Sequence, residues 1–307
     1  MAETTSRTDP PRRAVFFQGR IVDATEARLP AGDAGVLYGL GFFETFRTSG
    51  GRPHHWRFNQ ARLQQACATA GIVLPPTFLA RDEVRLADVV RGLLKEHQMN
   101  DAVFRYTVTS GCAAESDARG DIFPAPTEFM TLRALPPPPP AEGIALRVLN
   151  LSRDNGEWLP RPKSLNYANA FAGADELRRR RAAPADEGLF LSRSGARVVE
   201  TARQNLAWFE GETFCYPDPV LGAVAGTCLE WALQLFPAAE PRRALLPDLF
   251  VADAVVVLNA VRGITPVREV WDAQDQNRFR VFDSAANSHV VRLVQRWNEA
   301  LRASAVA

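Results

Sequence analysis

The sequence predicts an α+β fold, because strand-like and helix-like segments are mixed along the chain without strict alternation. Hydrophobic residues make up 46% of the 307 residues and charged residues 23%, which is typical of a globular chain with a sizeable core. Five consecutive prolines favour stiff polyproline II backbone and so indicate a spacer, with a partner-binding motif as the alternative. We expect a disordered leader over 1–13, an α/β domain over 14–135, a proline-rich linker over 136–142 and a second domain over 143–307.

In the first half, strands are predicted by apolar alternation and helices by apolar residues three or four positions apart. Leu63, Ala66 and Ala70 mark one helix face, and Gly71 ends that helix. The glycine-rich stretch 31–41 is expected to be a loop. We expect strands over 16–22, 42–48, 102–109 and 128–135, and helices over 59–70 and 81–97.

The second half shows the same mixture of short strands and amphipathic helices. A hairpin is expected around Ser194 and Gly195, and another turn at Glu210 and Gly211. We expect strands over 144–151, 188–192, 196–200, 205–209, 213–216, 254–258 and 265–270, and helices over 167–181, 228–236 and 284–301.

Charge and cysteine usage exclude several classes of protein. The net charge of +1 argues against nucleic acid or anionic membrane as an obligate partner, and no apolar run is long enough to span a bilayer. The four cysteines and four histidines are scattered without CxxC or HExxH spacing, so we expect no metal site, reduced thiols and a cytoplasmic location. Neither a GxGxxG motif after a strand nor a P-loop motif is present.

Lysine is rare: of the 36 basic residues only Lys95 and Lys163 are lysine. Arginine stays protonated and cannot serve as an amine nucleophile, whereas lysine can once its environment lowers its pKa. Lys95 lies at the polar end of a predicted helix, where a cation favours the helix dipole. Lys163 lies between a predicted strand and helix, so it is the candidate nucleophile, with a surface lysine as the alternative.

Two further features complete a recognisable set of groups. Glu200 ends an apolar strand; it is either a surface residue or a buried carboxylate that needs a cationic partner, such as a protonated pyridine nitrogen. Residues 222–228 place small residues before a helix, where backbone N–H groups bind an anion or where Thr227 simply caps the helix. A lysine, a carboxylate and a phosphate cradle are together what a pyridoxal phosphate enzyme requires.

The sequence resembles the class IV aminotransferases, the fold-type IV pyridoxal phosphate enzymes, from about Phe16 to about Trp297. The resemblance implies a small N-terminal α/β domain, a larger C-terminal barrel-like α/β domain, a cofactor between them and a homodimer. It rests on six landmarks that occur in the family's order: the segment 38–47 (YGLGFFETFR), Arg62-Leu63, the segment 163–167 (KSLNY), Glu200 with Asn205-Leu206, the loop 222–227, and the segment 263–267 (GITPV).

The resemblance also implies roles for individual residues. Lys163 is similar to the Schiff-base lysine and general acid/base, and Glu200 to the carboxylate that keeps the pyridine nitrogen protonated. Tyr167 resembles the tyrosine near the cofactor's phenolic oxygen. The implied phosphate contacts are Arg62, Gly226 and Thr227, with a second contact at Asn259 and Ala260.

Departures from the family pattern bear on the substrate. Leu229 stands where the family usually has an arginine, just after the phosphate-binding loop 222–227. Thr109-Ser110-Gly111 stands where the family usually has Thr-Arg-Gly, so Ser110 replaces an arginine. Leu258-Asn259-Ala260 and Arg119-Gly120 look more like the lyase subgroup, although Asp121 replaces an aromatic residue there.

The resemblance therefore implies 4-amino-4-deoxychorismate lyase, a folate-pathway enzyme that gives 4-aminobenzoate and pyruvate. Arg119, or else Arg105, is expected to meet the substrate carboxylates. The alternatives are a D-amino-acid or branched-chain aminotransferase, and a non-catalytic relative.

Overall fold

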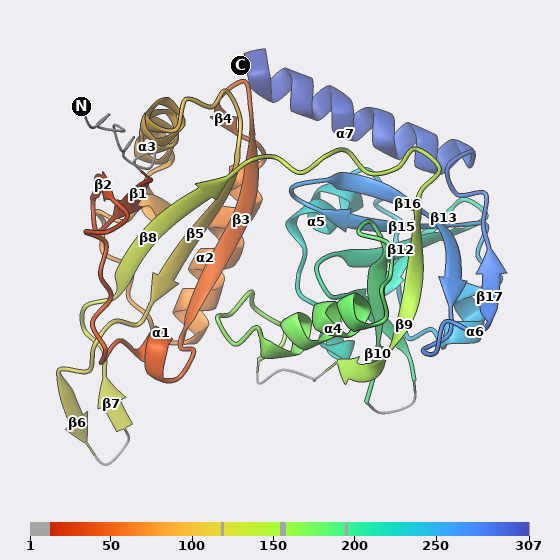
Figure 1. Ribbon diagram of the computed structural model, residues 1–307, viewed down its shortest axis with the longest axis horizontal. Coiled ribbons are helices and arrows are strands. Elements are labelled where there is room, and N and C mark those ends of the chain that lie inside the picture. Colours follow the sequence, from red (N-terminus) through yellow and green to blue (C-terminus); the bar gives the residue numbers. More distant parts are fainter. Residues whose placement is uncertain (1–12, 118–119, 154–157, 194–195, 307) are drawn as a thin grey trace, which may run out of the picture.

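The computed structural model describes residues 13–117, 120–153, 158–193 and 196–306. Two large sheets dominate it, and the extended segment 134–143 runs along one side of the molecule to connect them (Figure 1). A small hairpin of β6 (Glu115–Asp117) and β7 (Gly120–Ile122) projects from the first half. Within the described residues, no helix is long and apolar enough to cross a membrane.

The smaller sheet has six strands in the order β2-β1-β8-β5-β3-β4. Alternate residues of β3 point to opposite faces: Phe42 and Phe46 pack into the core, whereas Phe43 and Thr45 face the larger sheet. Two long helices supply the other side of that core. The strands are β1 (Ala14–Phe17), β2 (Arg20–Asp23), β3 (Gly41–Ser49), β4 (Arg52–Pro53), β5 (Val103–Thr109) and β8 (Thr127–Arg133), and the helices are α1 (Ala34–Leu37), α2 (Trp56–Thr69) and α3 (Glu83–Glu96), with a 3-10 turn at Leu79–Arg81.

The larger sheet closes on itself. Its strands follow the order β11-β10-β9-β16-β15-β12-β13-β14, and a further pairing of β11 with β12, at Glu200 and Asn205, completes a barrel. Strand β17 pairs with β16 outside this path. The strands are β9 (Ile144–Arg153), β10 (Glu187–Ser192), β11 (Val198–Thr201), β12 (Asn205–Glu210), β13 (Thr213–Pro217), β14 (Glu240–Arg242), β15 (Ala254–Asn259), β16 (Gly263–Trp271) and β17 (Arg278–Val281).

Helices cover the outside of the barrel. Leu206 and Trp208 of β12 belong to one buried cluster, whereas Ala207 and Phe209 belong to another that includes residues of α5 and α7. Both faces of β12 are therefore buried. The helices of this half are α4 (Ala168–Arg179), α5 (Thr227–Leu233), α6 (Leu246–Leu249) and α7 (Ser288–Val306), with a 3-10 turn at Pro219–Leu221.

Helix α7 crosses from the barrel to the smaller sheet (Figure 1). The backbone oxygen of Leu301 accepts a hydrogen bond from the Ser49 hydroxyl at 2.8 Å, and Ser304 Oγ lies 2.8 Å from His54 Nδ1. Near the middle of the helix, the Trp297 indole packs over Gly263, where β16 begins. The two halves of the chain are thus joined by packing as well as by the connecting segment.

Several sequence predictions need correction. Residues 16–22 form the hairpin of β1 and β2, because the backbone reverses at Gln18 and Gly19 with φ of 44° and 88°. The stretch 31–41 contains α1, capped by the Asp33 carboxylate. The last helix begins at Ser288, where the Asn287 side chain accepts the N–H groups of His289 and Val290. The sequence did not predict β4, β6, β7, β14, β17 or α6.

The remaining elements match within a few residues, among them β5, β8, β9, α2, α3 and α4. The expected pairing of strands 188–192 and 196–200 is observed between β10 and β11. The turn at Ser194 and Gly195 and all but one residue of the expected leader lie outside the described residues.

The close approach of Trp297 makes Gly263 intolerant of a side chain. A Cβ there would lie 2.2 Å from Trp297 Nε1, at a φ of +72°. We expect Gly263→Ala to lower the free energy of unfolding by about 2–4 kcal/mol, because overpacking adds to backbone strain. Gly211→Ala is the matched control: φ is +57° with nothing within 4 Å, so only the strain of about 1 kcal/mol applies. Urea midpoints measure both, and equal midpoints would contradict the prediction.

Candidate active site

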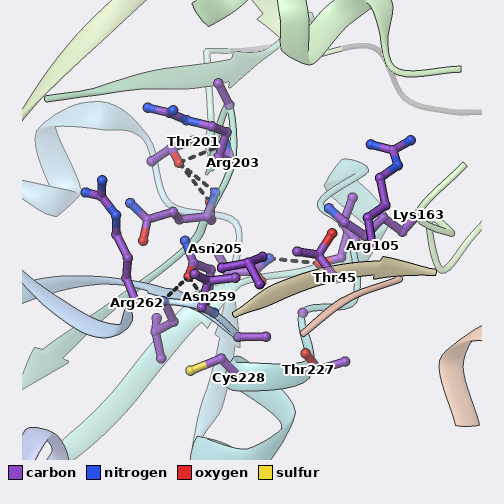
Figure 2. Close-up of a pocket in the computed structure, with 18 of the residues that line it drawn as sticks. Thr45, Arg105, Lys163, Thr201, Arg203, Asn205, Thr227, Cys228, Asn259 and Arg262 are labelled. Atoms are coloured by element: carbon purple, nitrogen blue, oxygen red, sulfur yellow. Dashed lines mark hydrogen bonds between the residues drawn. The ribbon is translucent and has the colours of Figure 1, made fainter. Parts of the chain in front are cut away.

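A cavity of about 550 Å³ lies between the smaller sheet and the barrel. Strands β3, β5 and β8 form one wall, and the end of the barrel with the loop before α5 forms the other. Figure 2 shows Lys163 and Arg105 together at one side of it and Arg203 and Arg262 at the other. Among the predicted residues, Lys163, Arg62, Tyr167, Glu200, Gly226, Thr227, Asn259, Ala260 and Arg105 all line this cavity.

Lys163 is held by backbone pairing beside β3. Its carbonyl accepts a hydrogen bond from Phe43 N at 2.9 Å, and Leu165 N donates to the Gly41 carbonyl at 2.9 Å. The Lys163 amine lies 4.8 Å from the Phe43 ring centroid and 5.2 Å from that of Tyr167. Burial lowers the pKa of the amine to about 8, and the Arg62 guanidinium acts in the same direction. A reactive neutral amine is therefore accessible near neutral pH.

Glu200 is buried at the seam of the barrel. Its Oε1 lies 2.6 Å from Arg153 Nη2, and its Oε2 accepts the Val224 N–H at 3.1 Å. Burial raises the pKa of the Glu200 carboxyl, while Arg153 favours its charged form. The sequence predicted that a buried Glu200 needs a cation, and in this structure Arg153 is that cation.

Arg62 reaches the cavity from α2. Its Nε donates to Glu44 Oε1 at 2.8 Å and its Nη2 to Glu44 Oε2 at 2.5 Å. Its Nη1 donates to the carbonyl of Ala225, in the loop before α5, at 2.5 Å. Arg62 therefore connects the smaller sheet to the expected phosphate cradle.

The loop before α5 packs closely on the barrel. A Cβ at Gly226 would lie 1.5 Å from Asn205 Oδ1, so this position requires glycine. Asn205 Nδ2 donates to the Val224 carbonyl at 2.8 Å, which fixes the loop against β12. The helix cap is Gly226 and not Thr227, which is the first helical residue; no side chain caps the helix. The first N–H groups of α5 are left free of side-chain partners at the cavity wall.

The turn between β15 and β16 forms the next part of the wall. Asn259 Oδ1 accepts the N–H groups of Val261 and Arg262, at 2.9 and 2.7 Å. The Arg47 guanidinium donates to the Val261 carbonyl at 3.1 Å from β3. The Asn259 side chain thus shapes this turn by its own hydrogen bonds. The phosphate contact expected at Asn259 and Ala260 stays a prediction.

Aromatic rings form the floor near Lys163. The Phe43 and Tyr167 rings meet edge to face with centroids 5.4 Å apart, and the Arg105 guanidinium lies 3.6 Å from the Phe43 centroid. The Tyr167 hydroxyl donates to the Ala202 carbonyl at 3.4 Å, and burial raises its pKa. Arg119, the other expected carboxylate-binding residue, lies outside the described residues.

Two residues that depart from the family pattern, Leu229 and Ser110, do not reach the cavity. Leu229 packs partly buried against the cluster between α5, α7 and the barrel. Ser110 is buried, and its N–H donates to the Leu40 carbonyl at 3.2 Å. Neither side chain is among the described residues that line the cavity.

Sequence reasoning missed several lining residues. Arg153 is one of 34 arginines, and nothing local distinguishes it from a surface arginine at the end of a strand. Glu44, which does not line the cavity but pairs with Arg62, lay inside a recognised segment and received no role. Phe43, Thr45, Arg133, Arg203, Gln204 and Arg262 were also missed, although strand alternation in β3 could have placed Phe43 and Thr45 on the same face.

These residues fit the expected pyridoxal phosphate. The cavity volume lies within the range for a cofactor with its substrate. Arg62 and the uncapped start of α5 suit a phosphate, Glu200 suits a protonated ring nitrogen, and Lys163 suits the aldehyde carbon. Their roles toward the cofactor remain predictions.

The model of the family described as amino-transferase class IV matches residues 41–270. An aminodeoxychorismate lyase of Bacillus subtilis (strain 168) is 27% identical over 265 residues, which cover 83% of this chain and 86% of that protein. A putative branched-chain-amino-acid aminotransferase of Methanocaldococcus jannaschii is 26% identical over 269 residues, which cover 83% of this chain and 87% of that protein.

The fold is also similar to a crystal structure of 4-amino-4-deoxychorismate lyase from Pseudomonas aeruginosa. The TM-score is 0.73 at 23% identity, and the match covers 94% of this chain and 99% of that one.

The lowered pKa of Lys163 predicts a pH-dependent effect on stability. Below about pH 8 the folded chain carries the free-energy cost of a buried, charged Lys163 amine. Between about pH 8 and 10.5 the amine is neutral in the folded state but still protonated in the unfolded state, so the free energy of unfolding rises with pH. In the cofactor-free chain, Lys163→Met should therefore be more stable than the wild type at pH 7, by on the order of 1–3 kcal/mol. The difference should shrink toward pH 10.

Urea midpoints at pH 7 and 9.5 measure this effect. Lys95→Met, at an exposed position of α3, is the control for loss of a surface lysine. An advantage of Lys163→Met that is the same at both pH values would contradict the assigned pKa.

Proposed function

Because the chain belongs to the class IV aminotransferase family of pyridoxal-phosphate-dependent enzymes, with its fold-type IV architecture, we propose that it is a 4-amino-4-deoxychorismate lyase of folate biosynthesis. The expected family, fold class and cofactor are confirmed by that membership, and the chain is an enzyme. The choice of lyase, and of its substrate, is the step proposed here.

The charge of the cavity is the observation that carries this proposal. The described lining residues include seven cationic side chains, Arg62, Arg105, Arg133, Arg153, Lys163, Arg203 and Arg262, but only two carboxylates, Glu187 and Glu200. Arg153 pairs with Glu200 and Arg203 with Glu187, and Arg62 pairs with the neighbouring Glu44. A net positive cavity suits a substrate with two carboxylates, whereas a branched aliphatic side chain gains nothing from guanidinium groups.

Arg105 is placed to receive one of those carboxylates. Its guanidinium stacks on Phe43 beside Lys163, so an anion bound there lies close to the reacting amine. The other carboxylate would lie toward Arg262 and Arg203, on the far side of the cavity (Figure 2). Binding at both ends would orient the substrate over the cofactor site.

Pyridoxal phosphate, when bound, supplies an electron sink for the carbon that carries the substrate amine. Lys163, with its pKa lowered to about 8, can then take the proton from that carbon near neutral pH. In the elimination, the electron pair of this C–H bond becomes the last double bond of the aromatic ring, and the C–O bond to the enolpyruvyl group breaks. The enolate of pyruvate leaves and takes up a proton at its methylene carbon to give pyruvate, and 4-aminobenzoate remains.

Location and assembly are further proposals. The free cysteines Cys67, Cys112, Cys215 and Cys228 agree with a reducing, cytoplasmic location. Val36, Leu37 and Tyr38, at and just after α1, expose more than half of their surface, as does Phe171 on α4. Apolar exposure of this kind supports a homodimer.

The proposed reaction predicts equal amounts of two products. Purified protein loaded with pyridoxal phosphate should convert 4-amino-4-deoxychorismate to 4-aminobenzoate and pyruvate in a 1:1 ratio, measured by chromatography and a coupled pyruvate assay. Lys163→Ala should lose at least about 10³-fold in kcat, because the proton acceptor is gone. Amino-group transfer from L-leucine or D-alanine to 2-oxoglutarate, without 4-aminobenzoate, would instead establish an aminotransferase.

Arg105 allows a separate test of substrate recognition. Arg105→Gln should raise KM by about tenfold or more, because a charge-assisted hydrogen bond to carboxylate is lost. The KM of Arg105→Lys should lie between that of Arg105→Gln and that of the wild type, since lysine keeps the charge but cannot form the two parallel hydrogen bonds of a guanidinium. Arg52→Gln, an exposed residue of β4, is the control. An unchanged KM in Arg105→Gln would remove Arg105 from the binding site.

A further inference from the structure

We propose that Glu44 is a positioning residue that holds the Arg62 guanidinium ready for the phosphate of the cofactor. This inference rests on the proposed function, in which Arg62 contacts that phosphate. Glu44 lies on β3 between Phe43 and Thr45, which both line the cavity, and its own side chain points to the opposite face, toward α2. It is therefore a buried carboxylate with no direct access to substrate or cofactor.

Both oxygens of the buried Glu44 carboxylate accept hydrogen bonds from side chains of α2. Both of its oxygens accept from Arg62, and Oε2 also accepts from Asn59 Nδ2 at 2.7 Å. Asn59 lies one turn before Arg62 on the same face of α2. The Glu44 side chain is 1% exposed and that of Arg62 is 11% exposed, so water competes little for these bonds. A forked pair of this kind fixes the plane of a guanidinium as well as its position.

The remaining donors of Arg62 show what this orientation serves. A guanidinium has five N–H donors. Two donate to Glu44 and one to the Ala225 carbonyl, which leaves one N–H on each Nη atom for a further partner. Arg62 lines the cavity together with Gly226 and Thr227, directly after Ala225. The two remaining N–H groups therefore belong to a guanidinium that lines the cavity beside Gly226 and Thr227, where a phosphate could accept them.

A carboxylate near a phosphate also has an unfavourable effect, because like charges repel. Here the Arg62 guanidinium stands between Glu44 and the cavity, and Glu44 itself does not line that cavity. The orienting effect should therefore dominate: without the fork, a flexible arginine side chain would have to be immobilised when the phosphate binds. Removing the carboxylate should weaken binding of the phosphate and leave binding of the pyridine ring unchanged.

Comparing pyridoxal phosphate with pyridoxal, which lacks the phosphate, isolates this contribution. Dissociation constants of both compounds are measured on the full-length, cofactor-free chain from the absorbance of the lysine-bound compound. We expect Glu44→Gln to raise the Kd of pyridoxal phosphate about tenfold and to leave that of pyridoxal unchanged within about twofold. Arg62→Ala should show the same selective loss, at least as large.

Glu128→Gln is the matched control. Glu128 is also a buried carboxylate of the smaller sheet, 1% exposed, but it accepts from the Tyr106 hydroxyl and Leu79 N, within the core. It should change stability without changing the ratio of the two dissociation constants. If Glu44→Gln does not fold, Glu44→Asp is the alternative variant. It keeps the charge but shortens the side chain by one methylene, and it should show a smaller selective loss of affinity for pyridoxal phosphate.

Two outcomes would overturn the inference in distinguishable ways. A wild type that binds pyridoxal phosphate, with an unchanged ratio in Glu44→Gln or Glu44→Asp, would refute the role of Glu44 and leave the proposed function intact. A wild type that does not bind pyridoxal phosphate would refute the proposed function and this inference with it.

Discussion

The pairing of β11 with β12 at Glu200 and Asn205 closes the barrel, and the cavity is organised around that closure. The two paired residues are also the ones that hold the loop before α5, since Glu200 accepts from Val224 N and Asn205 donates to the Val224 carbonyl. A single backbone pairing therefore fixes the carboxylate, the loop and the start of the helix relative to one another. If the barrel stayed open, these groups would have no fixed geometry.

Two buried ion pairs fix charged side chains at the cavity wall. Arg153 pairs with Glu200 and Arg62 with Glu44, and in each pair the two residues are well separated in sequence. Such pairs add little to stability, because desolvation offsets most of their attraction, but they fix orientation. Fixed charges of this kind can stabilise charged groups of a substrate or cofactor without a large rearrangement of the protein.

Much of this site was predictable from composition and order along the chain. The scarcity of lysine pointed to Lys163, and small residues before a helix pointed to residues 222–228. The partners were not predictable, because an ion pair such as that of Arg153 depends on which strands become neighbours in a closed sheet. The hairpin at Gln18 and Gly19 was missed because a single glycine is a weak turn signal, and the positive φ of Gln18, a residue other than glycine, leaves no mark in the sequence.

The path of α7 has a consequence for the order in which the molecule is completed during synthesis. Ser49 belongs to the third strand of the chain, yet its hydroxyl finds its acceptor on Leu301, 252 residues later. At ribosomal rates of 5–20 residues per second, roughly 13–50 s separate the emergence of these partners. The β3–β4 end of the smaller sheet therefore lacks its contacts with α7 until the rest of the chain has been synthesised. Its final contacts are the last to form, although its strands are the first to be synthesised.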